Sequence, residues 1–111
     1  MTTQHSSLAA GRWFELSLVE QMANIGSEIE RTLSWRGRNE VNSSAAFGRG
    51  LELLDLTIAD PRHRERLREL TRLRELLADF FLFDNSFRST DESWHRYFGA
   101  FSVAAALRRG L

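Results

Sequence analysis

The sequence contains no cysteine, no lysine and only one proline among its 111 residues. The absence of cysteine excludes thiolate catalysis, zinc sites built on thiolates and redox switching. It is also typical of proteins from a reducing compartment. All fifteen basic residues are arginines, and they balance fifteen acidic residues, so the formal net charge is zero. This balance argues against a protein that coats nucleic acid without sequence preference.

Long apolar runs are also absent. No run approaches the roughly 18 residues that would span a bilayer. The N-terminus has neither the positively charged region nor the apolar core of a signal peptide. We therefore expect a cytoplasmic protein without a membrane partner. The length fits one domain that buries a core without disulfides or a structural metal. We expect a disordered tail over residues 1–12 and a single domain over residues 13–111.

Apolar side chains recur at the spacing of an α-helix through most of the chain. Ser17 and Glu20 have the spacing of a capping box, which predicts that the first helix begins there. The apolar face of this helix consists of Leu18, Met22, Ile25, Ile29 and Leu33. Gly26 lies beside that face and would permit another helix to approach closely. Gly37 is placed to end the helix.

The second helix is expected to run from Asn39 or Ser43 to Ala59. Its core face consists of Phe47, Leu51, Leu54 and Ile58. Leu53 and Leu56 lie on the other side, so this helix is apolar nearly all round. Such a helix is either buried at the centre of the monomer or carries a second interface. In the second case, Leu53 and Leu56 form a surface for oligomerisation or for a partner.

Asp60 suits the N-cap of a third helix, and Pro61 suits its first position. A fourth helix begins at Ser89 or Thr90, and Ser89 has capping-box spacing to Glu92. No segment alternates with the period of a β-strand. Four amphipathic helices joined mostly by short turns predict an all-α fold. The expected architecture is a four-helix bundle with antiparallel, up-down topology.

Arg64, Arg68 and Arg72 recur every four residues along the third helix, which predicts three guanidinium groups along one side. Because guanidinium groups bind phosphates and carboxylates through paired hydrogen bonds, this stripe is a candidate site for RNA or an acidic partner. The alternative is a solvated face with ion pairs three residues apart. Those pairs would join Glu65 to Arg68 and Glu69 to Arg72.

Six residues separate Arg88 from His95. This pattern resembles the Arg-x4–6-His motif of HEPN domains, which are small helical bundles and in some cases ribonucleases. The resemblance implies that Arg88 steadies phosphate charge and that His95 serves in acid–base chemistry during metal-independent RNA cleavage. The sequence has Ser89 where family members often have Asn. The alternative is that both residues are exposed on the polar flank of the last helix.

Glu52 and Asp55 share one side of the second helix, where two carboxylates could hold Mg²⁺. Glu-x-x-Asp resembles half of the MazG nucleotide pyrophosphohydrolase pattern, but the first helix lacks the Glu-x-x-Glu of that family. We favour ordinary ion pairing, with an arginine from a neighbouring helix as the buried partner of Asp55. We expect no metal site and no cofactor.

Eight aromatic side chains lie between Phe80 and Phe101. Most have helical spacing and are expected in the core. Phe83 and Phe87 fall in the loop before the last helix, where they are harder to bury. They would either anchor a partner or cap one end of the bundle.

The chain resembles small bacterial helical-bundle proteins, most distinctively in the stretches 24–31, 51–60 and 89–94. It resembles HEPN-type and nucleotidyltransferase-partner proteins, and the four-helix accessory proteins of bacterial reverse transcriptases. The resemblance implies oligomerisation and a protein or RNA partner. We therefore expect a non-enzymatic accessory protein that forms a homo-oligomer and binds a nucleotidyltransferase, a reverse transcriptase or RNA. The alternative is a ribonuclease or toxin–antitoxin component that uses Arg88 and His95.

Overall fold

The computed structural model describes residues 11–110, so most of the tail expected over residues 1–12 lies outside the described residues. Four long helices form the domain: α2 (Leu18–Trp35), α3 (Glu40–Ala59), α4 (Leu67–Leu82) and α5 (Asp91–Arg108). A 3₁₀-helix, η1 (Pro61–Arg66), precedes α4. Over the described part of the chain there is no β-strand. The prediction of an all-α fold is confirmed.

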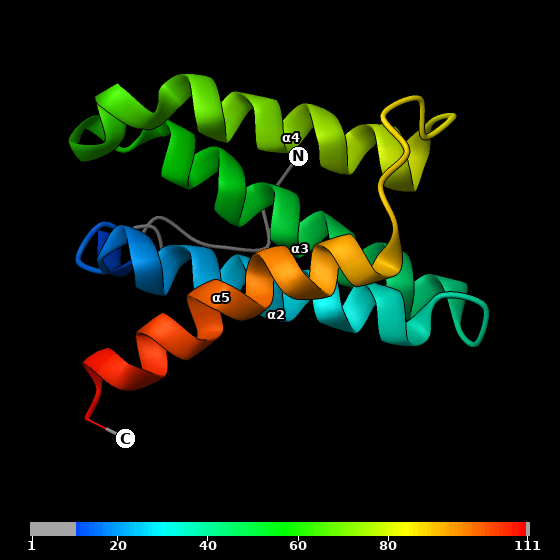
Figure 1. Cartoon of the computed structure of the whole chain (residues 1–111), viewed down its shortest axis with the longest axis horizontal. Coiled ribbons are helices and arrows are strands. Elements are labelled where there is room, and N and C mark those ends of the chain that lie inside the picture. The colour runs from blue at the N-terminus through cyan, green and yellow to red at the C-terminus, as the bar shows by residue number, and fades with distance from the viewer. Residues whose placement is uncertain (1–10, 111) are drawn as a thin grey trace.

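Helix α2 packs against both α3 and α5, and α3 packs in turn against α4. Successive long helices run in opposite directions, and α5 crosses α2 at an inclination (Figure 1). Helices α4 and α5 meet through aromatic side chains, such as Phe80 and Trp94 with ring centroids 6.2 Å apart. The alternating directions agree with an up-down topology. A closed four-helix bundle stays a prediction, because α4 and α5 lie at the two edges of this arrangement.

Helix α2 begins as its sequence predicts. The Ser17 hydroxyl accepts a hydrogen bond from the Glu20 N–H at 3.2 Å, and the Glu20 carboxylate accepts one from the Ser17 N–H at 3.4 Å. This capping box satisfies two N–H groups that a helix start leaves without partners. The helix ends before Gly37, which has a φ of +82°. Glycine adopts this left-handed conformation without a steric penalty, so the chain turns back into α3 there.

Both neighbours of α2 approach it at a glycine. A Cβ atom built on Gly26 would lie 2.8 Å from Cβ of Phe98 in α5. A Cβ atom built on Gly50 of α3 would lie 3.3 Å from Cδ1 of Ile29 in α2. The close approach expected at Gly26 is therefore present. It lets Phe98 and Ile29 become almost completely buried.

Helix α3 is buried on more than one side. It begins after Asn39, while Ser43 is buried and donates a hydrogen bond to the Thr32 carbonyl at 3.0 Å. Leu54 is fully buried, and Leu53 is only 6% exposed and also belongs to the core. The side chain of Leu53 is therefore largely covered within the monomer, and its use with Leu56 as an interface stays a prediction. The burial of Leu53 agrees with the alternative, in which this helix lies at the centre of the monomer.

The third helix does not start as a regular α-helix at Pro61. His63 has φ −105° and ψ 23°, which interrupts the helix, and the α-helical part begins only at Leu67. The physical reason is the side chain of His63, which is buried and hydrogen-bonded toward α2. The capping box of α5 also differs from the prediction. It joins Thr90 to Ser93, not Ser89 to Glu92.

Replacement of Gly26 by alanine should destabilise the protein by about 1–3 kcal/mol, because the added methyl group forces α5 away from α2 at Phe98. Urea unfolding followed by circular dichroism measures this change. Gly99→Ala is the matched control within α5, since its Cβ meets nothing within 4 Å. That substitution should stabilise the protein by about 0.5–1 kcal/mol. Equal effects of the two substitutions would contradict the close approach.

Candidate functional site

The most exposed aromatic side chains lie in the loop between α4 and α5. Phe83 is 73% exposed and Phe87 is 49% exposed, and Leu82 at the end of α4 is 58% exposed. We call these three residues the loop surface. The three residues fall within one short segment, 82–87, and exposed apolar side chains that gather on a surface are typical of interaction sites. Of the two uses considered for the aromatic loop residues, capping of the core does not fit this degree of exposure.

The backbone of this loop is held by Asp79, which is buried near the end of α4. Its carboxylate accepts hydrogen bonds from the N–H groups of Ser86 at 2.8 Å and Phe87 at 3.0 Å. Its carbonyl accepts from the N–H groups of Phe83 at 3.3 Å and Asn85 at 3.0 Å. One residue thus fixes both aromatic positions. Asp79 cannot be singled out from the sequence, because nothing local distinguishes it from the other acidic residues.

Two further residues fix the loop. Asn85 has a φ of 53°, and its side chain both accepts from the Ser89 N–H at 2.9 Å and donates to the Ser89 carbonyl at 3.0 Å. Arg88 has a φ of 57°, a conformation that costs a residue with a Cβ atom free energy. The surrounding hydrogen bonds hold Arg88 there. Phe83 and Phe87 are consequently exposed on a fixed backbone.

Two arginines contact residues in or beside the loop between α4 and α5. The guanidinium of Arg72 lies over the ring of Phe87, 4.4 Å from its centroid. Arg36, at the end of α2, forms an ion pair of 2.6 Å with Asp91 at the start of α5. The same guanidinium lies 5.2 Å from the ring centroid of Phe80. These contacts join the loop to α4, and the start of α5 to the end of α2.

The predicted arginine stripe is divided between two elements. Arg64 lies in η1, whereas Arg68 and Arg72 lie in α4, and all three are exposed. Arg68 and Arg72 keep the four-residue spacing of an α-helix, but Arg64 lies in the 3₁₀-helix and does not continue that spacing. The expected pairs of Glu65 with Arg68 and of Glu69 with Arg72 are replaced by others. The ion pairs present join Arg66 to Glu69 at 3.5 Å and Arg72 to Glu75 at 3.4 Å.

His95 lies on α5 with its Nδ1 atom 2.6 Å from the Glu30 carboxylate of α2. Arg88 lies in the preceding loop, outside any helix. Both residues are exposed, as the alternative to the HEPN interpretation expected. The contact with Glu30 was missed, because only the packing of α5 on α2 brings the two residues together. Ribonuclease activity through Arg88 and His95 stays a prediction.

The carboxylate of Asp55 binds an arginine from the neighbouring helix, as predicted. Arg74 of α4 donates from Nε to Asp55 Oδ1 at 2.7 Å. The pair is exposed, however, and not buried as expected. Within the described residues, no three His, Cys, Asp or Glu side chains gather where they could hold a metal ion.

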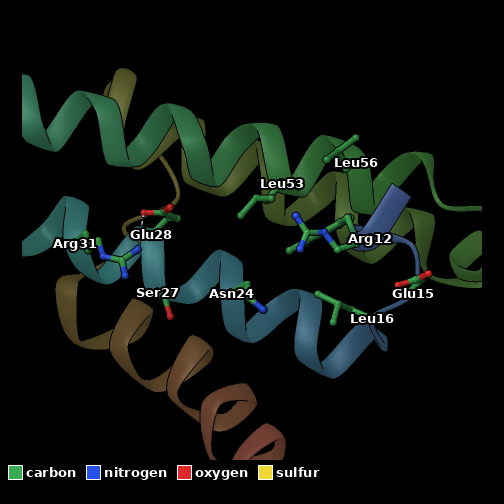
Figure 2. A pocket seen from close by; sticks show the side chains of 10 residues that line it. Arg12, Glu15, Leu16, Asn24, Ser27, Glu28, Arg31, Leu53 and Leu56 are labelled. Carbon is green, nitrogen blue, oxygen red and sulfur yellow. Dashed lines mark hydrogen bonds and ion pairs between the residues drawn. The ribbon is translucent and has the colours of Figure 1, made fainter. Parts of the chain in front are cut away.

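A hollow of about 520 Å³ lies between α2, α3 and the segment before α2, and Figure 2 shows the side chains around it. Leu53 and Leu56, the two residues predicted as an interface, are part of its wall. Glu28 lies at its edge. Burial raises the pKa of this carboxyl, but hydrogen bonds from Arg49 and Arg31 outweigh burial, so its pKa is lowered overall. Glu28 is therefore ionised and held in place.

A buried polar network joins the beginning of α2 to the start of η1. Gln21 donates to the Trp13 carbonyl at 3.0 Å and to Asp60 Oδ2 at 3.3 Å. The Gln21 oxygen accepts from Nε2 of His63 at 2.7 Å. Arg62 contacts both carboxylate oxygens of Asp60. These groups satisfy each other's hydrogen bonds, so the network stabilises the fold and is not an open reactive site.

Comparison with models of protein families, with characterised proteins and with solved structures found no match. Functional inference therefore depends on the residues themselves. Over residues 11–110, no helix is both long enough and apolar enough to cross a membrane.

The polar network predicts a specific dependence of stability on pH. Hydrogen bonds from Arg62 lower the pKa of Asp60 well below its ordinary value of 3.8. The ionised carboxylate of Asp60 therefore contributes fully to the stability of the fold above about pH 5. This contribution is lost as the pH falls below 4. Asp60→Asn should be less stable than the wild type at pH 7, and the difference should shrink toward pH 2. Thermal unfolding across this range measures it. A difference independent of pH would contradict the role of the charge.

Proposed function

We propose that this protein is a non-enzymatic helical-bundle accessory protein that binds a protein partner through its loop surface. The observation that carries the proposal is the exposure of Phe83 and Phe87 on a backbone fixed by Asp79. A loop that served only to connect α4 to α5 would need neither aromatic side chain in solvent.

The energetic argument starts from the two phenylalanines. An aromatic side chain buries a large apolar area and loses little conformational entropy, which makes it an effective anchor at interfaces. The loop loses no further conformational entropy on binding, because the hydrogen bonds of Asp79 and Asn85 already fix its backbone. Phe83 and Phe87 therefore support binding to an apolar pocket on a partner.

The charges favour a protein over RNA as the partner. The segment 82–92 contains Asp84, Asp91 and Glu92 against Arg88, which gives one positive and three negative charges, a net charge of −2. Adding Arg36 and Arg72, which contact this segment, brings the net charge only to zero. Binding of nucleic acid depends on an excess of positive charge that releases counterions. The segment around the loop surface has no such excess of positive charge.

Photo-crosslinking tests the proposal directly. A photoreactive phenylalanine analogue placed at position 83 or 87 should crosslink one and the same protein in the native cells. The analogue at position 103 is the control, because Val103 is 61% exposed but lies on α5 away from the loop. The purified pair should then lose at least tenfold in affinity on Phe83→Ala, or about 1.4 kcal/mol. Crosslinks to RNA alone, or to the same protein from all three positions, would refute the proposal. Crosslinking only to a second copy would replace it with homo-oligomerisation.

The fixed loop gives a second expectation. Asp79→Asn leaves Phe83 and Phe87 unchanged but replaces one of the two carboxylate acceptors by a donor. The amides of Ser86 and Phe87 should exchange hydrogen faster, and the affinity for the identified partner should fall several-fold. Asp84→Asn is the charge-matched control in the same loop. If loosening the loop leaves the affinity unaltered, pre-organisation has no part in binding.

A further inference from the structure

Arg88 has a backbone conformation that does not suit its residue type. Among the described residues other than glycine, only Asn85 and Arg88 have a positive φ, of 53° and 57°. This left-handed conformation costs free energy for a residue with a Cβ atom. Glycine adopts it freely, and asparagine tolerates it. Arginine is therefore a residue that the backbone at position 88 disfavours.

The two residues with positive φ differ in what their side chains do. The Asn85 amide bonds to both backbone groups of Ser89, which explains an asparagine at position 85 from within the loop. Arg88 contributes only its backbone N–H, which donates to the Asn85 carbonyl at 3.0 Å. Its side chain is exposed and, within residues 11–110, forms no hydrogen bond, ion pair or ring contact. A glycine would make the same backbone hydrogen bond without the steric cost.

Nearby carboxylates leave the guanidinium of Arg88 without a partner. Asp91 forms its ion pair with Arg36 at 2.6 Å. The carboxylate of Asp79 accepts hydrogen bonds from two backbone N–H groups of the loop. The guanidinium of Arg88 is thus available to a group outside the chain. A planar guanidinium binds a carboxylate through two parallel hydrogen bonds, which are stronger than hydrogen bonds between neutral groups.

The surroundings of Arg88 favour a single carboxylate over a row of phosphates. Arg88 directly follows Phe87, so its side chain leaves the backbone next to the loop surface. Asp84 and Glu92 are exposed in the same segment and form no ion pair with another described residue. Their negative charges repel a polyanion such as RNA. A single carboxylate surrounded by apolar side chains needs only the one guanidinium.

We propose that Arg88 determines the specificity of the loop surface by pairing with an aspartate or glutamate of the protein partner. This carboxylate lies beside the apolar side chains of the partner that contact Phe83 and Phe87. The inference rests on the proposed function, because it names the chemistry of the partner at the same surface. The apolar contacts around the pair exclude water and strengthen it, which offsets the cost of the Arg88 conformation in the complex.

The probe is a library of random peptides displayed on phage and selected on the wild-type protein. Peptides bound at the loop surface are identified by a loss of binding of at least about tenfold on Phe83→Ala. These peptides should share an aspartate or glutamate flanked by apolar residues. Selection on Arg88→Gly should instead give apolar peptides without a shared acidic position.

Synthetic, C-terminally amidated copies of the selected peptides then measure the pairing. Arg88→Gly should weaken binding of the acidic peptide roughly tenfold. A peptide with glutamine or asparagine at the acidic position should bind the wild type and Arg88→Gly equally. Arg88→Gly should also raise the thermal midpoint of unfolding by a few degrees, because glycine removes the cost of the positive φ. Arg108→Gln removes an exposed arginine at the far end of α5 and should leave peptide binding unchanged.

The outcomes separate this inference from the proposed function. Peptides that require Phe83 but bind Arg88→Gly as tightly as the wild type would overturn the role of Arg88 and leave the proposed function in place. A selection that yields no peptide dependent on Phe83 would overturn both. An unchanged or lower thermal midpoint of Arg88→Gly would contradict the backbone cost from which the inference starts.

Discussion

The close packing of α2 against two neighbours is the constraint on which the rest of the structure depends. Gly26 admits Phe98 of α5, and Gly50 of α3 admits Ile29, so neither contact tolerates a larger side chain without movement. Because α2 is covered on both sides, it becomes a central helix, and Met22, Ile25 and Ile29 in the middle of its apolar face are almost fully buried. The free energy of these contacts comes mainly from the apolar area removed from water.

The same constraint explains where interaction surfaces can form. With α2 in the centre, α4 packs on α3 and α5 packs on α2. The two edge helices meet through side chains such as Phe80 and Trp94. The loop between α4 and α5 connects these two edge helices. Asp79 is critical here, because it ties the end of α4 to the loop while the Arg36–Asp91 ion pair ties the start of α5 to α2. The loop surface thus lies where the packing of the helices is least complete.

Local signals predicted the helices well. The Ser17 capping box and the turn at Gly37 depend on neighbours in sequence, and both are present. Of the two expected starts of the second helix, Asn39 and Ser43, the structure has Asn39. The sequence was less informative where the structure depends on contacts between residues far apart in the chain. Leu53 is buried because α3 is covered on several sides, and His63 interrupts the third helix because its ring binds Gln21, 42 residues away. Within the candidate site, the sequence identified the two loop aromatics, Phe83 and Phe87, as difficult to bury. The fixing of their loop by Asp79 requires knowledge of contacts in space.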